Sequence, residues 1–300
     1  MKRIGILAVA LLLLAACTDE GPDPVPDPEP APEASVSEPP TPAPSEDGIP
    51  IEESSRRIPV QVWFLSELRG EPVLRLHHVE IPATSAVGRA AIEQLLAGVP
   101  EDLEARDPKA WSAVPEETEL LGLTIENGTA TVDFNEGFGD TGLGSTYDGI
   151  QIDQVVWTLT QFPTVKRVDF LIDGEHPEYI GGHGIVIDKP QTRKGNQHYL
   201  PPIVVFTPYS GQELTSPFTM TGLSNVFEAT VSYRIRDEAG KIIDEGFTTA
   251  TCGTDCYGTF SQEIDVDAEG PVVLEVFESS AEDGRPLHMQ RVPLILEASS

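Results

Sequence analysis

Two hydrophobic patterns follow one another in residues 150–174. In the first, apolar residues are spaced three and four apart, which predicts one buried face of a helix. They are Ile152, Val155, Val156 and Leu159. Pro163 ends this helix, because its ring blocks the carbonyl four residues earlier and it has no N–H. Apolar residues then recur every second position at Val168, Phe170 and Ile172, the period of a strand. A helix followed directly by a strand needs a sheet on which both can pack, so this stretch predicts the centre of an α+β domain.

A β-hairpin is predicted just before this helix. Asn127 and Gly128 favour a two-residue turn, because both central positions of that turn take positive φ. The turn fixes the register of the two strands, and the predicted inward pairs are all apolar. They are Ile125 with Ala130, Leu123 with Val132, and Leu121 with Phe134. The pairs Glu126–Thr129 and Thr124–Thr131 are expected on the face that meets water.

Strands and a helix are also predicted nearer the N-terminus. Val60, Val62 and Phe64 alternate as one strand, and Leu74 and Leu76 lie on a second. The next helix is expected to begin at an N-cap, Thr84 or Ser85, and to end at Gly98. Its apolar face is Ala91, Ile92, Leu95 and Leu96. These elements place residues 57–188 in one α+β sandwich domain.

Four stretches of this domain resemble a known family, the GerM-type (GerMN) domain of sporulation and spore germination. They are residues 90–98, the segment around Pro115, residues 127–134 and residues 158–163. The resemblance implies a small α+β sandwich, found often in lipoproteins outside the membrane and similar to the ring-building modules of secretion and sporulation complexes. No catalytic residues are established for the family. It therefore implies assembly or binding, without implying that this organism sporulates.

Strand patterns dominate the remainder of the chain, after a polar linker at residues 189–200. Seven short strands are predicted within residues 201–297, which indicates an all-β immunoglobulin-like sandwich. The expected strands are residues 203–206, 218–222, 228–236, 241–248, 257–266, 272–278 and 287–296. Part of this region resembles the immunoglobulin-like domain that commonly follows GerM-type domains, at Ile203, Pro208, residues 216–218, Gly222, Glu228 and residues 237–240. That resemblance implies a second extracytoplasmic interaction module without known activity.

The N-terminus resembles that of a bacterial lipoprotein. Lys2 and Arg3 precede a short apolar run, as in a secretory signal peptide, predicted here as residues 1–16. The run is too short for a membrane span, which needs roughly 20 apolar residues. Leu14-Ala15-Ala16-Cys17 resembles a lipobox, which implies cleavage before Cys17 and attachment of acyl chains such as palmitate to it. The chain would then be anchored by lipid to the extracytoplasmic face of the cell membrane. A secreted protein with a chance cysteine is the alternative.

Residues 17–56 are predicted to form a disordered tether. Proline occurs at every second position from Pro22 to Pro32, interleaved with acidic residues, which favours an extended and self-repelling chain. At roughly 3.1 Å per residue such a tether reaches on the order of 100 Å. It would hold the two domains away from the membrane.

The chain is strongly acidic. Its 49 Asp and Glu against 19 Lys and Arg give a formal net charge of −30. Such a charge opposes binding to nucleic acid, whose phosphates require neutralisation, and to anionic lipid surfaces. Solubility explains the charge most simply, and a basic partner is the alternative.

Candidate sites for chemistry are few. Cys252 and Cys256 are the two thiols left once Cys17 is acylated, and an even pair in an exported chain predicts a disulfide. His77 and His78 are neighbours on a predicted strand, so they should point to opposite faces and share no metal. Two acidic stretches are expected to be a solvated loop and a β-turn in place of cation sites. They are Asp133, Asn135, Glu136, Asp140 and Asp148, and residues 265–270.

We therefore expect no catalytic, metal or cofactor-binding residues, since no nucleophile elbow, P-loop or zinc-protease motif is present. The leading hypothesis is a non-catalytic, membrane-anchored lipoprotein that binds or assembles with cell-envelope partners, either a protein complex or peptidoglycan. Self-association through the first domain belongs to this hypothesis. A peptidoglycan-acting enzyme is one alternative, because catalytic carboxylates need not be close in sequence. A receptor for a small ligand or cation is another.

Overall fold

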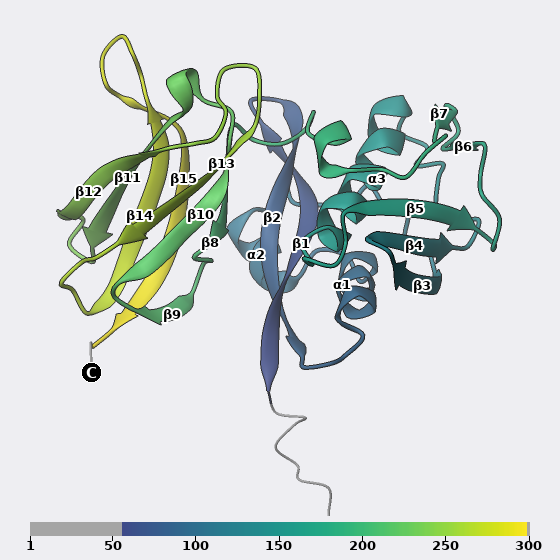
Figure 1. The fold of residues 1–300 in the computed structure, drawn as a ribbon, viewed down its shortest axis with the longest axis horizontal. Coiled ribbons are helices and arrows are strands. Elements are labelled where there is room, and N and C mark those ends of the chain that lie inside the picture. Colours follow the sequence, from purple (N-terminus) through teal and green to yellow (C-terminus); the bar gives the residue numbers. More distant parts are fainter. Residues whose placement is uncertain (1–55, 299–300) are drawn as a thin grey trace, which may run out of the picture. The chain divides into compact units, whose positions relative to one another are not determined.

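The computed structural model describes residues 56–298 (Figure 1). The predicted signal peptide, Cys17 and all but the last residue of the predicted tether lie outside the described residues. The described residues all belong to one compact unit. Among the helices of the described part, none is both long enough and apolar enough to cross a membrane.

The first half of the described chain contains both helices and strands, as the sequence predicts. The elements are β1 (Arg57–Leu68), β2 (Glu71–Pro82), α1 (Val87–Leu96), α2 (Glu101–Arg106), β3 (Leu120–Glu126), β4 (Thr129–Phe134), α3 (Ser145–Leu159), β5 (Arg167–Ile172), β6 (Tyr179–Ile180) and β7 (Ile185–Val186). Strands β1 and β2 form an antiparallel ribbon, and β3, β4 and β5 form a three-stranded sheet in that order. The short helix α2 has no counterpart among the predicted elements.

The predicted hairpin is β3 and β4, and its register is confirmed for two of the three apolar pairs, although Ile125, expected to face inward, is 41% exposed. Ile125 faces Ala130 and Leu123 faces Val132. The third pair is wrong, because a bulge before Gly122 places Leu120 opposite Phe134 and leaves Leu121 49% exposed. A bulge adds one residue to one strand, which turns the side chains beyond it to the other face. Turn chemistry at Asn127-Gly128 could not predict it.

The first core lies between this sheet, the β1–β2 ribbon and the helices α1 and α3. The helix α3 runs through its centre, and every residue from Ile150 to Leu159 is buried. The parallel pairing of β4 with β5 places Val132 beside Phe170 beneath that helix. Gly98 follows α1 with φ +84°, as expected for the glycine that ends a helix. At the other end, however, Ala86 is the N-cap, and Thr84 only accepts a hydrogen bond from its N–H.

The β1–β2 ribbon is buried on both faces. Val60, Val62 and Phe64 pack into the first core, as the alternation predicts. Trp63 and Leu65, on the opposite face, are also fully buried, in a separate cluster with Leu74, Ile150 and Trp157. The sequence pattern indicated only one buried face, because the apolar residues of the second face are covered by segments far along the chain.

The second half is an immunoglobulin-like β-sandwich. Its strands are β8 (Ile203–Thr207), β9 (Gln212–Thr215), β10 (Phe218–Ser224), β11 (Thr230–Asp237), β12 (Ile242–Thr249), β13 (Gly258–Ile264), β14 (Gly270–Ser279) and β15 (Pro286–Glu297), with a 3₁₀ turn at Phe227–Ala229. One sheet has the order β13-β10-β8, and the other has the order β12-β11-β14-β15-β9. All seven predicted strands are present. The sequence missed β9, a short strand that pairs in parallel with the end of β15.

Residues 189–200, expected to be a polar linker, are packed against both halves. Gln191 exchanges two backbone hydrogen bonds with Val168, and a 3₁₀ turn follows at Arg193–Gly195. The guanidinium of Arg193 lies 4.4 Å from the ring centre of Trp157 and 5.4 Å from that of Phe206. Leu200 then joins the cluster around Trp63.

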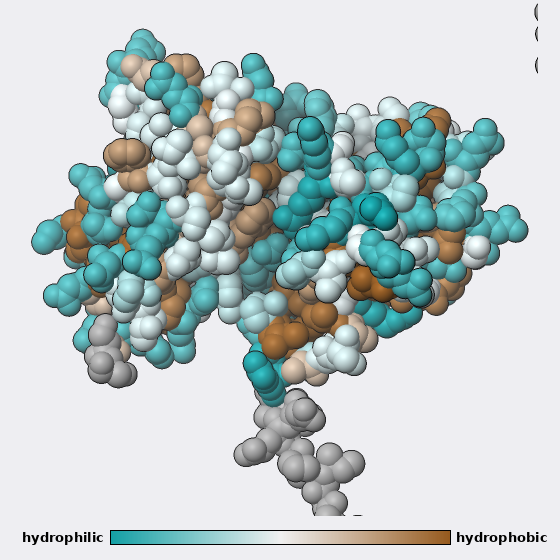
Figure 2. All heavy atoms as spheres, viewed as in Figure 1, coloured by the Kyte–Doolittle hydropathy of each residue, from teal (hydrophilic) through white to brown (hydrophobic). Residues whose placement is uncertain are grey.

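This cluster is a third core, shared by the two halves. Trp63 and Trp157 come from the first half, and their ring centres are 4.9 Å apart. Val204 and Leu223 come from the second half. On the face drawn in Figure 2, hydrophilic and neutral residues cover most of the surface, and hydrophobic residues gather in the region of α1.

Candidate functional site: a cleft beside strand β2

A cleft of about 940 Å³ lies where β2 and α2 meet the second half of the chain. Its volume is at the upper end of the range for ligand-binding sites in proteins, roughly 300–1,000 Å³. The second half contributes residues of β8, the turn between β8 and β9, and β15. The cleft is therefore built by both halves together.

Four polar side chains form a connected group at one wall. Arg106 on α2 donates to Asp102, one helical turn earlier, at 2.7 Å, and to the hydroxyl of Ser210 at 3.0 Å. The same guanidinium lies 3.3 Å from Nδ1 of His77, whose Nε2 is 3.5 Å from Asp102. Burial lowers the pKa of His77, and Asp102 partly opposes that shift. Arg106 thus joins the first half to the second half.

His78 makes a second contact across the cleft. Its ring stacks on that of Tyr209 with centres 4.7 Å apart, and the hydroxyl of Tyr209 lies 3.3 Å from a carboxylate oxygen of Glu80. Burial and the charge of neighbouring His77 lower the pKa of His78 to about 4, so this ring is neutral at neutral pH. The two histidines point to opposite faces of β2, as predicted. Neither is exposed.

Arg75 is the guanidinium in the cleft with the weakest set of partners. Its Nη1 donates to the side-chain oxygen of Gln290 at 3.3 Å, and its buried Nε has no hydrogen-bond partner in the described part of the chain. Burial lowers the pKa of Arg75, which Asp107 partly offsets. A buried donor without an acceptor is costly, so this group is a natural place for an external acceptor.

Arg291 connects the cleft to a buried ion cluster on the second sheet. Glu275, which is 3% exposed, accepts from Nε of Arg291 at 3.0 Å and of Arg236 at 2.9 Å, and also from Arg234. Burial opposes ionisation of Glu275, but these hydrogen bonds lower its pKa to about 2. One carboxylate thus holds three guanidiniums.

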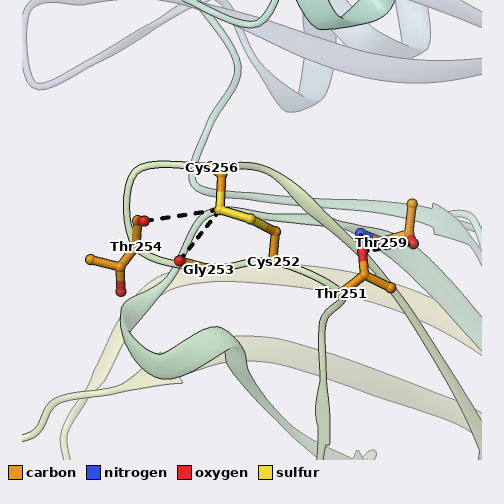
Figure 3. Close-up of a disulfide and its surroundings, with 6 residues drawn as sticks. All are labelled: Thr251, Cys252, Gly253, Thr254, Cys256 and Thr259. Atoms are coloured by element: carbon orange, nitrogen blue, oxygen red, sulfur yellow. Dashed lines mark hydrogen bonds between the residues drawn. A yellow bond between two sulfur atoms is a disulfide. The ribbon is translucent and has the colours of Figure 1, made fainter.

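Cys252 and Cys256, the predicted pair, form a disulfide in the loop between β12 and β13, with Cα atoms 5.8 Å apart (Figure 3). The loop packs on the segment before β11, where the N–H of Thr254 donates to the carbonyl of Val226. Directly after the loop, the hydroxyl of Tyr257 donates to the carbonyl of Leu200 at 2.8 Å. The disulfide is therefore a structural feature beside the junction, outside the cleft.

The acidic loop before α3 is organised by hydrogen bonds within the protein. Asp148 is fully buried and accepts from the hydroxyl of Thr141 at 2.7 Å and from the ring of His183 at 2.9 Å. Burial raises the pKa of Asp148, but these bonds outweigh it and lower the pKa below its usual value. Asn135 accepts from the N–H groups of Glu119 and Gly137, which fixes the end of β4.

No group of three or more metal-binding side chains comes together within residues 56–298. Residues 265–269 form an irregular connection in place of the predicted β-turn. In the same part of the chain, no serine, threonine or cysteine side chain is hydrogen-bonded to a histidine. At the cleft, Arg106 lies between Ser210 and His77, so that hydroxyl is bonded to a guanidinium. The arrangement offers hydrogen-bond donors and aromatic surface for binding.

Sequence reasoning did not find the cleft, although one signal was present. Arg75 and His77 interrupt an apolar strand, and the register places them opposite Phe64 and Val62 of the buried face. Polar residues at inward positions of a ribbon often mark a site. The partners from α2, β8 and β15 could not be found in this way, because only the tertiary fold brings them to β2.

Comparisons with known proteins agree with this architecture. Residues 52–178 match the family described as "Sporulation and spore germination", and residues 202–285 match the family described as "Immunoglobulin-like domain of bacterial spore germination". No curated protein gave a significant match.

Several solved structures are similar to the chain. The first GerMN domain of the sporulation protein GerM from Bacillus subtilis is 20% identical, with 46% of this chain and 98% of that chain covered and a TM-score of 0.39. The tandem GerMN domains of the same protein are 17% identical, with 70% and 62% covered and a TM-score of 0.40. A putative lipoprotein from Clostridium perfringens is 18% identical, with 48% and 93% covered and a TM-score of 0.33.

The two family matches occur in the order in which the α+β sandwich and the β-sandwich follow each other in the fold. The chain therefore belongs to the proteins that join a GerM-type sporulation and spore germination domain to the immunoglobulin-like domain of bacterial spore germination.

Proposed function

We propose that this protein is an extracytoplasmic lipoprotein whose two joined domains form one non-catalytic binding module. A lipid on Cys17 would hold it at the membrane, and the acidic, proline-rich residues 17–56 would space the module from the lipid surface. The module would bind a cell-envelope protein complex or peptidoglycan. The lipobox-like residues before Cys17 support the anchor.

The junction between the domains is the observation that carries the binding proposal. Trp63, Trp157 and Leu223 share one core there, and Arg193 stacks between rings of both domains. Burial lowers the pKa of Arg193 to about 10, which reflects how fully the junction encloses it. The cleft lies at this same junction, so its geometry depends on both domains being held together.

The lipid anchor is tested by metabolic labelling. Cells would be fed an alkyne-bearing fatty acid, and the purified chain would be tested for label. Cys17→Ser should abolish labelling and release the protein from the membrane fraction, whereas Cys252→Ser with Cys256→Ser should leave both unchanged. Labelling that survives Cys17→Ser would overturn the anchor.

Partner binding is tested by photo-crosslinking in intact cells. A photoreactive residue would replace Glu213, which lines the cleft, or Glu282, in the exposed turn between β14 and β15. A discrete crosslinked species from position 213 and none from position 282 is the expected result. Co-sedimentation with purified cell wall distinguishes peptidoglycan from a protein partner. If neither assay captures a partner, the binding proposal fails.

Self-association of the first domain is part of the proposal. Strand β3 is an edge strand, and its Leu121 and Ile125 are 49% and 41% exposed. Exposed apolar residues on an edge strand favour contact with a second chain. Sedimentation velocity should show concentration-dependent association that Ile125→Lys removes and Thr124→Lys, on the opposite face, preserves. A monomer at the highest soluble concentration would contradict this part.

A further inference from the structure

The two outer edges of the β1–β2 ribbon differ in how many of their backbone N–H and C=O groups are hydrogen-bonded. On the edge of β1 that faces away from β2, the backbone groups of three alternate residues are hydrogen-bonded. Their partners are the side chains of two glutamines and the backbone of one other residue. The bonds join Gln61 to Gln161 (2.7 Å in each direction), Trp63 to Gln154 (2.8 Å) and Leu65 to Trp111 (2.8 and 3.0 Å). An uncovered strand edge would expose unpaired N–H and C=O groups, so this covering closes β1 to other chains.

On the outer edge of β2, the backbone is hydrogen-bonded at the first outward residue and largely unbonded at the residues that follow. In an antiparallel ribbon, alternate residues direct both backbone groups away from the partner strand. The N–H of Leu74 points outward, since it donates to the carbonyl of Tyr199 at 2.7 Å. The outward residues that follow are therefore Leu76, His78 and Glu80. Within residues 56–298, Leu76 and His78 make no main-chain hydrogen bond on this side, and Glu80 uses only its carbonyl, for Arg57.

This open edge lies in the cleft. All six residues from Arg75 to Glu80 line it. Because successive side chains of a strand point to opposite faces, a cavity that meets six residues in a row meets the edge of the strand. The free groups of Leu76 and His78 therefore face a space large enough for an extended chain.

The charges around the edge favour a carboxylate. Three acidic residues line the cleft: Asp102 is paired with Arg106, Glu80 is bonded by Tyr209, and the exposed Glu213 on β9 forms no ion pair within residues 56–298. Arg75 reaches across to Gln290, and no carboxylate of residues 56–298 lies within salt-bridge distance of it. A carboxylate can accept two parallel hydrogen bonds from one arginine side chain. It would supply the acceptor that the Nε of Arg75 lacks.

We propose that an extended acidic segment of a partner protein adds to the open edge of β2, with its backbone bonded to Leu76 and His78 and a carboxylate bonded to Arg75. Strand addition supplies affinity through the main chain, and the side-chain contact supplies selectivity. The proposal rests on the binding function proposed above and names the class of partner that the cleft takes.

Peptide selection on the full chain in detergent tests the side-chain contact. Random short peptides would be displayed and selected on the wild-type protein. The enriched peptides should carry Asp or Glu, and Arg75→Gln should weaken their binding about tenfold or more. Arg89→Gln, on the exposed side of α1, should leave it unchanged. Thermal unfolding of each variant checks that it is folded.

Hydrogen exchange tests the main-chain contact. Bound peptide should slow exchange of the amides of Leu76, His78 and Glu80, and should leave those of His77 and Val79 unchanged because they already face β1. Glu80→Pro removes one outward N–H, which an edge strand tolerates, and should weaken binding, whereas Glu80→Ala should weaken it less. The comparison isolates the main-chain group from the Glu80 side chain.

Three results would overturn the proposal: enriched peptides that lack acidic residues, bound peptide that leaves the three outward amides unchanged, or a peptide that binds only after deletion of residues 22–33. The last result would make the chain's own acidic tether the occupant. If crosslinking from position 213 still captures a partner in any of these cases, the binding function stands and only the class of ligand is wrong.

Discussion

At the residue scale, single buried ionisable groups determine how the stability of this chain changes with pH. Asp153 lies within α3 and is only 6% exposed, and burial raises its pKa to about 7. Its carboxyl group therefore keeps its proton over a pH range in which the unfolded chain has lost it. The buried carboxyl group is uncharged in the folded protein at low pH. The free energy of unfolding therefore decreases as the pH rises.

Asp153→Asn should stabilise the protein at alkaline pH. The folded state holds a proton that the unfolded state releases, so stability falls as pH rises from the ordinary value of 3.8 to about 7. The full loss is on the order of 4 kcal/mol and is present above that range. Chemical denaturation should show the variant to be more stable than wild type near pH 8 and similar to it near pH 4. Equal pH profiles for the two proteins would refute this account.

Glu275 has the opposite effect. Its pKa is about 2 in the folded state against an ordinary value of 4.5, so its contribution is complete above 4.5 and is lost as pH falls towards 2. Glu275→Gln should cost about 3 kcal/mol at neutral pH, since it leaves Arg234 and Arg236 without their acceptor. Denaturation profiles between these pH values should be flatter for the variant. Glu278→Gln, on the same strand, is the control.

At the scale of elements, Gln154 of α3 holds the helix to the β1–β2 ribbon. Gln154 donates to the carbonyl of Trp63 and accepts from the N–H of Ala113, both at 2.8 Å and both buried. The amide of Gln154 thus makes a hydrogen bond to the edge of β1 that the backbone of a neighbouring strand would otherwise make.

Gln154→Leu should destabilise the protein by roughly 2–4 kcal/mol, because it leaves a buried carbonyl and a buried N–H without partners while keeping the side-chain size. Urea unfolding measures the change. Gln262→Leu on β13, whose side chain bonds only the neighbouring carbonyl of Glu263, should have little effect. A loss of similar size in both variants would show that the edge bonds are not the cause.

Local pattern predicted most elements but not the features that depend on distant partners. Asn127-Gly128 fixed two hairpin pairs, since turn geometry acts on its neighbours, and the bulge at Leu121 then broke the third. Strand β9 was missed because it has only four residues, two of them exposed, and is held by the end of β15. The cleft was missed for the same reason, since Arg75 meets Gln290 only in the fold.

At the scale of the molecule, the described residues contain one core for each domain and a third that both domains share. The sequence predicts two domains, because the hydrophobic period changes from mixed to strand-only after residue 200. It could not indicate that Trp63 packs on Trp157 and that Leu200 and Leu223 close the same cluster. The predicted linker, residues 189–200, packs against both domains through Arg193 and Leu200.

The central claim is that the two domains form one body whose junction holds the cleft in shape. Native-state hydrogen exchange along a denaturant series tests it most directly, with buried amides such as Val132 in β4 and Ile235 in β11 as reporters of each domain. The account predicts that both amides exchange through the same opening, and that Trp63→Ala lowers the free energy of that opening for both by about 3–5 kcal/mol. Separate opening energies, with Trp63→Ala affecting only the first domain, would contradict it.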